Sequence, residues 1–197
     1  IEAALYGYMG FWQEPEGMDP ATGKAIYPEL NVWGASARSP MFGGIGNVEV
    51  GYYDSKNDEG GRNPYVRPSE YRFLMGFERE LGHELTGAFQ YYLEAIDGYG
   101  NYEQTVPPGA EARDNYRQML TMRLTKLLMQ QTLTLSLFMY WSPTDQDGYI
   151  RPNFKYKLTD HWLVQGGANL FWGEDEHTFW GRFQDNTNAF IGLRYSF

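Results

Sequence analysis

The chain has 197 residues, with 16 basic and 25 acidic side chains and no cysteine. That length suits one domain or part of one, and a formal net charge of −9 argues against a nucleic-acid surface. Without cysteine there is no disulfide framework and no thiol nucleophile, and no apolar run is long enough for a membrane-spanning helix. Nothing in the composition calls for a cofactor.

Apolar and polar residues alternate along about ten segments of the chain, which is the period of a β-strand. In one of the cleanest segments, Tyr71 and Phe73 fall on one face and Glu70 and Arg72 on the other. The alternation changes parity at residues 129–131, which predicts a tight hairpin there. The predicted strands are residues 1–13, 31–41, 47–53, 70–78, 85–94, 116–125, 132–141, 150–158, 162–172 and 188–197.

The connections between these strands alternate between long and short. Long polar connections are expected at residues 14–30, 54–68, 97–115 and 173–186, with a shorter one at 142–148. Short turns are expected at residues 42–44, 82–83, 129–131 and 159–161, and the chain ends on the side of the short turns. Outer-membrane barrels have this asymmetry, with short periplasmic turns and long outer loops, whereas a soluble sandwich does not require it.

The predicted strands are also longer than those of most soluble sheets. Trp162 and Trp172 are ten residues apart on one face, which corresponds to about 25 Å along the membrane normal for a tilted strand. Each indole ring would then lie in one of the two interfacial belts that favour aromatic side chains. The expected aromatic girdle comprises Trp33, Tyr71, Tyr116, Trp141, Trp162 and Trp172.

The last ten residues alternate without a fault and end in an aromatic residue. Ile191, Leu193, Tyr195 and Phe197 fall on the apolar face, opposite polar residues that include Arg194. This stretch resembles the closing strand of bacterial outer-membrane β-barrel proteins, whose C-terminal Phe is read by the assembly machinery. The resemblance extends over the whole chain at the level of architecture, and within the class it is porin-like, similar to large uncharacterised porins and alginate-export-type channels.

The resemblance implies an all-β fold, an antiparallel up-and-down transmembrane β-barrel with about ten strands in residues 1–197, treated as a single domain. It implies an outer-membrane location, with the long loops extracellular and the short turns and C-terminus periplasmic. The chain opens inside a strand-like stretch without a signal peptide, so we interpret it as a processed or shortened chain. It is then either a whole barrel or the C-terminal part of a larger one.

Charged residues on the polar faces of the strands are the candidates for a lumen or constriction. The predicted set is Arg38, Glu49, Arg72, Glu78, Glu94, Arg123, Arg151, Lys155, Lys157 and Arg194, with the basic members concentrated on the later strands. A basic wall facing an acidic wall would set a transverse field across a wet lumen. In a narrow barrel the same charges would instead pair and fill the interior. The sequence leaves both arrangements open.

The acidic residues of the connections form a second candidate site. A solvated outer rim is the simpler interpretation, and the alternative is divalent cations that bridge to lipopolysaccharide. A weak metal-binding candidate comprises Asp145, Asp147, Glu174, Asp175 and Glu176; it lacks the distal Glu of a calcium loop. No nucleophile–histidine spacing indicates an enzyme: His83 and His161 fall on predicted turns, and only His177 lies near loop carboxylates.

The sequence therefore predicts a porin-like channel for passive passage of small polar or charged solutes and no enzyme. The alternative is a narrow, filled barrel that serves as a structural or docking component of an outer-membrane complex. The expected partners are outer-membrane lipid and lipopolysaccharide, the barrel-assembly machinery and small solutes. An oligomer or a larger membrane complex is compatible with the sequence.

Overall fold

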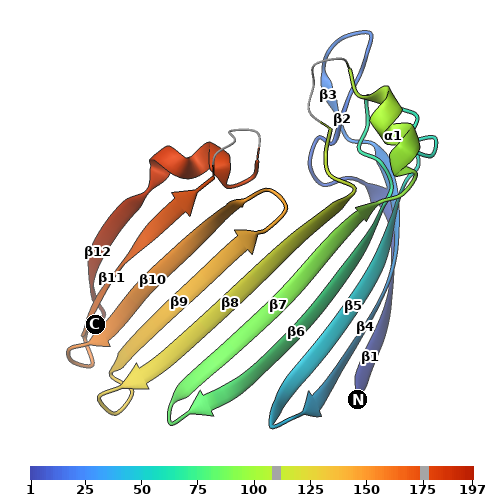
Figure 1. The fold of residues 1–197 in the computed structure, drawn as a ribbon. Coiled ribbons are helices and arrows are strands. Elements are labelled where there is room, and N and C mark those ends of the chain that lie inside the picture. The colour runs from blue at the N-terminus through green and yellow to red at the C-terminus, as the bar shows by residue number, and fades with distance from the viewer. Residues whose placement is uncertain (108–111, 174–177) are drawn as a thin grey trace. The chain divides into compact units, whose positions relative to one another are not determined.

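A computed structural model describes residues 1–107, 112–173 and 178–197 of the chain. The predicted all-β class is confirmed: ten strands form one sheet in the order β1-β4-β5-β6-β7-β8-β9-β10-β11-β12, and β2 and β3 form a separate two-stranded sheet (Figure 1). The strands are β1 (Glu2–Phe11), β2 (Gly17–Met18), β3 (Ala25–Ile26), β4 (Glu29–Met41), β5 (Gly44–Ser55), β6 (Glu70–Gly82), β7 (Leu85–Ile96), β8 (Tyr116–Leu128), β9 (Leu133–Ser142), β10 (Asp147–Lys157), β11 (Trp162–Trp172) and β12 (Asn188–Tyr195).

Each of the ten predicted strands corresponds to one strand of the large sheet, and the bounds of β11 coincide with the prediction. The predicted hairpin at residues 129–131 is confirmed, because Met129, Gln130 and Gln131 all have positive φ angles, of 51°, 55° and 67°. Three elements were not predicted and lie in the long connections. They are the β2–β3 hairpin, the helix α1 (Tyr99–Thr105) and the 3₁₀-helix η1 (Gly181–Asn186).

The chain divides into two compact units, which we describe separately. The first comprises Ile1–Ser39, Asn47–Met75 and Tyr92–Arg117, and the second comprises Pro40–Gly46, Gly76–Tyr91 and Gln118–Phe197. In the first unit the three long connections pack on one another at one end of the strands (Figure 1). The amide of Met18 donates to the carbonyl of Tyr65, and the Asn101 side chain donates to the carbonyl of Gly60. The long connections are therefore joined to one another in this unit.

In the second unit hydrogen bonds join one short turn to the next. The Lys126 ammonium donates to the carbonyl of His83, and the amide of Lys157 donates to the carbonyl of Thr132. At the C-terminal end the amide of Ser196 donates to the carbonyl of His161. The short turns are thus linked in chain order, as expected for an up-and-down arrangement of antiparallel strands.

The pairs β1–β4, β8–β9, β9–β10, β10–β11 and β11–β12 are antiparallel. The strand order begins with β1 and ends with β12, so within the described residues these two strands are not paired with each other. The antiparallel meander is observed. Within the described residues the sheet is not closed into a barrel. No helix in the described part of the chain is long and apolar enough to cross a membrane.

Few apolar side chains are buried among the described residues, namely Trp12, Leu30, Val66, Ile96 and Met119, and many more are exposed. The largest fully buried side chains among the described residues are polar: Glu70, Asp58, Asp147 and Ser142. Large apolar side chains are exposed instead, including Leu5 at 88 % and Ile191 at 81 %. Soluble proteins almost never bury acidic groups fully while leaving long rows of apolar side chains in contact with solvent.

Candidate functional site

In the first unit the structure brings two of the predicted lumen residues, Arg72 and Glu94, into one ionic cluster. β6 begins at Glu70, and its alternation places Glu70 and Arg72 on the polar face, opposite Tyr71. β7 places Tyr92 and Glu94 on the polar face of its own strand. Loop residues complete the cluster, which consists of Glu16, Arg67, Glu70, Arg72, Glu94, Arg113 and Arg117.

Glu70 is the centre of this ionic cluster, and its side chain has no exposed surface. Arg67 binds it through two atoms, with Nε 3.1 Å from Oε2 and Nη2 3.1 Å from Oε1. Arg72 donates from Nε to Oε1 at 2.6 Å and also contacts Oε1 through Nη2, while Arg113 Nη2 lies 3.7 Å from Oε2. Three guanidinium groups thus compensate one buried carboxylate, as burial of a charge requires.

Glu94 and Glu16 are the other two carboxylates of the ionic cluster. The Glu94 carboxylate lies 3.7 to 3.8 Å from Arg67, Arg72, Arg113 and Arg117, and it accepts a 3.0 Å hydrogen bond from the Tyr92 hydroxyl. Glu16 accepts from Arg67 Nη1 at 2.5 Å. These bonds connect the polypeptide after β1, the connection between β5 and β6, and the connection between β7 and β8.

Arg67 is the loop residue that joins most of these groups. Its burial disfavours the charged form, but the neighbouring carboxylates of Glu70, Glu16 and Glu94 outweigh that effect and raise the pKa of Arg67 above its usual value. The guanidinium also lies over the Trp12 ring, 4.8 Å from its centroid. Arg67 therefore stays charged at every pH that the protein meets.

Arg67 and Glu16 lie in connections that the sequence predicts to be long and polar, and the structure draws both side chains into the ionic cluster. The spacing Arg67–Glu70–Arg72 could have predicted the contact of Arg67 with Glu70, because a loop arginine just before a strand can reach a carboxylate on the first strand residue. No sequence signal indicated that Arg113, from a distant connection, would reach the same carboxylate.

In the second unit Arg123 and Arg151 lie on one face, on either side of Phe138. The register pairs Phe138 of β9 with Arg123 of β8 and with Arg151 of β10. The next row on the same face consists of Thr125, Ser136 and Asn153. These six residues, with Leu137 and Tyr149, line a hollow of about 490 Å³.

The connection between β11 and β12 folds back onto this face of the second unit, next to the hollow. Trp180 stacks on Tyr149, with ring centroids 5.0 Å apart and an interplanar angle of 18°, and it meets Tyr140 edge-on at 5.2 Å. The Trp180 amide also donates to Asp147, whose side chain is fully buried. The sequence treated residues 173–186 as an outer loop only. The run of aromatic residues at 179, 180 and 183 was the signal for inward packing.

The remaining predicted lumen residues are spread over the polar face. Arg38 is opposite Glu2 in the β1–β4 register, and Glu49 and Glu78 are exposed on β5 and β6. Lys155 is opposite Thr134 and Gln165, and Arg194 is opposite Leu163. Lys157 pairs with Asp160 of the adjoining turn at 2.8 Å. In the described residues Arg123, Lys155 and Arg194 form no ion pair, in contrast to the arginines of the ionic cluster.

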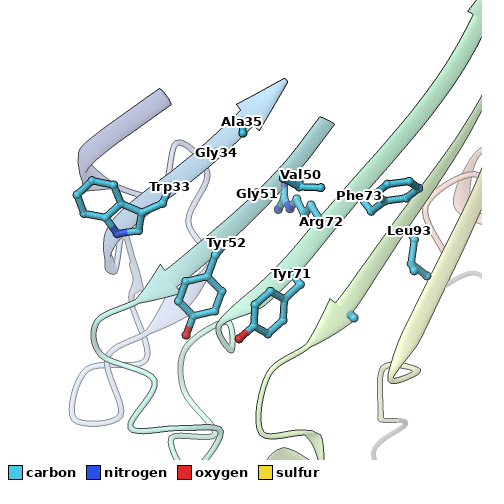
Figure 2. A pocket seen from close by; sticks show the side chains of 11 residues that line it. Trp33, Gly34, Ala35, Val50, Gly51, Tyr52, Tyr71, Arg72, Phe73 and Leu93 are labelled. Atoms are coloured by element: carbon cyan, nitrogen blue, oxygen red, sulfur yellow. The ribbon is translucent and has the colours of Figure 1, made fainter. Parts of the chain in front are cut away.

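The predicted girdle residues lie on the apolar faces of both units. In the first unit Trp33 and Tyr71 are 52 % and 53 % exposed, and Tyr116 is exposed at the start of β8. Figure 2 shows Trp33, Tyr52 and Tyr71 around a groove of about 470 Å³, with the Tyr52 and Tyr71 ring centroids 4.7 Å apart. Apolar side chains and glycines form most of its lining, so the groove is a feature of the apolar face.

In the second unit two levels of aromatic side chains are separated along β11. Trp162 contacts Tyr195 of β12 at 4.8 Å between ring centroids, at the end with the short turns. Trp172 and Trp141 are both register partners of Gly148, ten residues further along β11. The Trp172 ring covers Gly148 so closely that a Cβ there would lie 2.1 Å from it. Trp162 and Trp172 therefore lie at opposite ends of β11.

The predicted assembly residues are exposed. Ile191, Leu193 and Tyr195 are 81 %, 63 % and 52 % exposed on one face of β12, and Phe197 lies beyond the end of that strand. Of the weak metal candidates, Asp147 is buried against Trp180, while Glu174, Asp175 and Glu176, like His177, lie outside the described residues. Among the residues that the structure describes, no group of three or more His, Asp or Glu side chains has a geometry that could hold a metal ion.

Comparison with known proteins adds no family assignment. No family model matches the chain, and no curated protein matches it. The site therefore has to be interpreted from its own geometry and chemistry.

Replacing Glu70 by Gln is expected to lower the free energy of unfolding by about 3 kcal/mol, because the buried guanidiniums of Arg67 and Arg72 lose their compensating charge. The measurement is equilibrium unfolding of the refolded protein in urea. Lys56→Gln is the control, since it breaks an exposed ion pair with Asp54 and should cost less than about 1 kcal/mol. Equal losses in the two variants would show that Glu70 is no more than a surface charge.

Proposed function

We propose that this chain forms the wall of an outer-membrane, porin-like channel for passive passage of small polar or charged solutes. The observation that carries the proposal is the inverted polarity of the strands. Fully buried side chains are acidic or hydroxylic, and apolar side chains such as Leu5, Met9 and Leu193 are 63 to 88 % exposed. An apolar face of this extent is stable in contact with lipid, which covers it without an energetic penalty.

The length and aromatic pattern of the strands support a membrane location. The ten strands of the large sheet have 8 to 13 residues, compared with about 9 to 11 in tilted transmembrane strands. Trp162 and Trp172 mark two levels about 25 Å apart along the normal of a tilted strand. Lipopolysaccharide and phospholipid are the partners that this proposal implies at the apolar face, and the barrel-assembly machinery is implied at the C-terminal strand.

Basic side chains of the second unit that form no ion pair within the described residues favour a water-filled lumen. Arg123, Arg151 and Lys155 are exposed on the polar face, and a charge there needs water or an anion as a neighbour. Basic residues at a constriction attract anions and set selectivity. The proposed channel is accordingly weakly anion-selective, and Arg194 on β12 adds to the same field.

The ionic cluster of the first unit favours the second candidate, a filled barrel that serves as a structural or docking component. Glu70 and Glu94 are compensated by four arginines at one end of the strands, so this part of the polar face is closed by side chains. A lumen filled in that way throughout would carry no steady current. Conductance across a planar bilayer separates the two candidates directly.

The proposal further includes strands beyond the ten observed. β1 pairs only with β4 and β12 only with β11 in the described strand order, so each has an edge of backbone groups without a partner strand. Such an edge cannot face hydrocarbon, because no water is available to bond its amides and carbonyls. We propose that additional strands continue the sheet from these edges and complete a barrel wider than ten strands.

Changing Arg151 and Lys155 together to Glu is expected to shift the channel toward cations, with the chloride-to-potassium permeability ratio falling by a factor on the order of ten. The measurement is the reversal potential in a planar bilayer across a KCl gradient. Lys24→Glu combined with Lys56→Glu makes the same charge change in the long connections and should leave the ratio nearly unchanged. An absence of conductance in the unmodified protein would support the filled barrel instead.

The proposed orientation predicts which residues can be labelled from outside the cell. A cysteine in place of Glu103, exposed on α1, should react with a membrane-impermeant maleimide on intact cells, and a cysteine in place of His83 should not. The chain has no cysteine of its own, so each variant carries a single reactive thiol. Both sites should react after the outer membrane is broken. The reverse pattern on intact cells would invert the orientation.

Deleting Phe197 is expected to reduce the amount of folded protein in the outer membrane severalfold while leaving the stability of the refolded protein unchanged. The physical reason is that Phe197 is fully exposed and lies beyond the end of β12, so its role is recognition and not packing. The measurement is the heat-modifiable band in isolated outer membranes. Phe42→Ser is the control, since Phe42 is an 83 % exposed phenylalanine in a short turn. Equal losses in both variants would contradict a specific role for Phe197.

A further inference from the structure

The hollow on the polar face of the second unit has the construction of a ligand site. Its two rows are fixed by the strand register, with Arg123–Phe138–Arg151 in one row and Thr125–Ser136–Asn153 in the next. Neighbouring strands are about 4.8 Å apart, so the Cα atoms of the two arginines are about 10 Å apart across Phe138. The hollow between and around these side chains measures about 490 Å³, enough for a small organic molecule.

Side chains of the described residues do not neutralise the charges of the hollow. Within the described residues, neither Arg123 nor Arg151 forms a salt bridge, and Arg151 leans over the Phe190 ring at 5.8 Å. The register pairs Phe190 with Gly167, which has no side chain, and this leaves room for Arg151 to reach Phe190. By contrast, each arginine of the ionic cluster contacts at least one carboxylate. The two arginines of the hollow are therefore available to an anion from solution.

The remaining lining defines what that anion should carry. Thr125 and Ser136 provide hydroxyl groups and Asn153 an amide, all able to bond hydroxyl groups of a ligand. Phe138 lies between the two arginines and offers an apolar ring to the C–H face of a carbon skeleton. A guanidinium binds a carboxylate through two parallel hydrogen bonds, so the arginines suit a carboxylate group.

We propose that this hollow is a binding site for small hydroxylated carboxylates, with the carboxylate at Arg123 and Arg151 and the hydroxyl groups at Thr125, Ser136 and Asn153. The inference rests on the proposed function, because it names the class of solute that the channel selects. It adds a saturable site to what would otherwise be a general electrostatic preference for anions.

The test is isothermal titration calorimetry on the full polypeptide folded in detergent micelles, because binding is then measured without conductance. The probes are gluconate, glucose, which lacks the charge, and hexanoate, which lacks the hydroxyl groups. Gluconate should bind at least about tenfold more tightly than either of the other two, since a charged hydrogen bond and the hydroxyl contacts each contribute. Failure of gluconate to bind, or equal binding of hexanoate, would overturn the proposal.

Variants locate the site. Arg123→Gln and Arg151→Gln should each weaken gluconate binding by about tenfold or more. Lys56→Gln removes one positive charge from a connection of the first unit, and it should change the affinity less than about twofold. Ser136→Ala should weaken gluconate and leave hexanoate unchanged. If Lys56→Gln weakens binding as much as Arg123→Gln, the effect is general electrostatics and no site exists.

Conductance of the same preparation separates this inference from the proposed function. If the protein conducts ions but binds gluconate no better than hexanoate, the proposed channel is supported and the proposed binding site is contradicted. If it binds gluconate with the predicted variant pattern but does not conduct, the binding site is supported and the channel is contradicted.

Discussion

The buried carboxylate of Glu70 is the constraint on which the first unit depends. Its charge can stay buried only if guanidiniums surround it, and the chain supplies Arg67 and Arg113 from two connections and Arg72 from the strand itself. Glu16 binds Arg67 in turn and adds the polypeptide that follows β1. Three connections that are far apart in sequence therefore have to meet at one point. Charge pairing fixes the ends of the strands together with the buried apolar side chains of Trp12, Leu30, Val66 and Ile96.

In the second unit, aromatic packing and not charge pairing holds a connection at the ends of the strands. Trp180 stacks on Tyr149 and meets Tyr140, while its amide bonds the buried Asp147. Arg182 adds to this packing, because its guanidinium lies over the rings of Phe179 and Phe183. Within the described residues, the guanidiniums of Arg123 and Arg151 have no carboxylate partner on the same face. This difference is why the polar face is closed by charges in one unit and presents open positive charge in the other.

The fold was largely predictable because a strand with one apolar and one polar face repeats every two residues, and ten such segments are unmistakable in the sequence. The candidate site was not. Arg72 and Glu94 were expected on the polar face, but the contact of Arg113 with Glu94 depends on where a connection of nearly twenty residues folds, about which alternation says nothing. The inward packing of Trp180 was missed for the same reason, since loops were interpreted from their charge alone.

The exposed apolar side chains are the main argument for the proposal that lipid, and not water, is the solvent of the apolar face. In water, exposed apolar side chains such as Leu5, Met9 and Ile191 would favour collapse or aggregation. The reason is that removing a leucine-sized side chain from water lowers the free energy by about 2 kcal/mol. In lipid the same side chains cost nothing, and the backbone ladder between antiparallel strands becomes the main source of order. That ladder stabilises the sheet only if every edge is paired. The exposed apolar face and the unpaired edges of β1 and β12 are the two observations on which the proposed lipid-facing barrel rests.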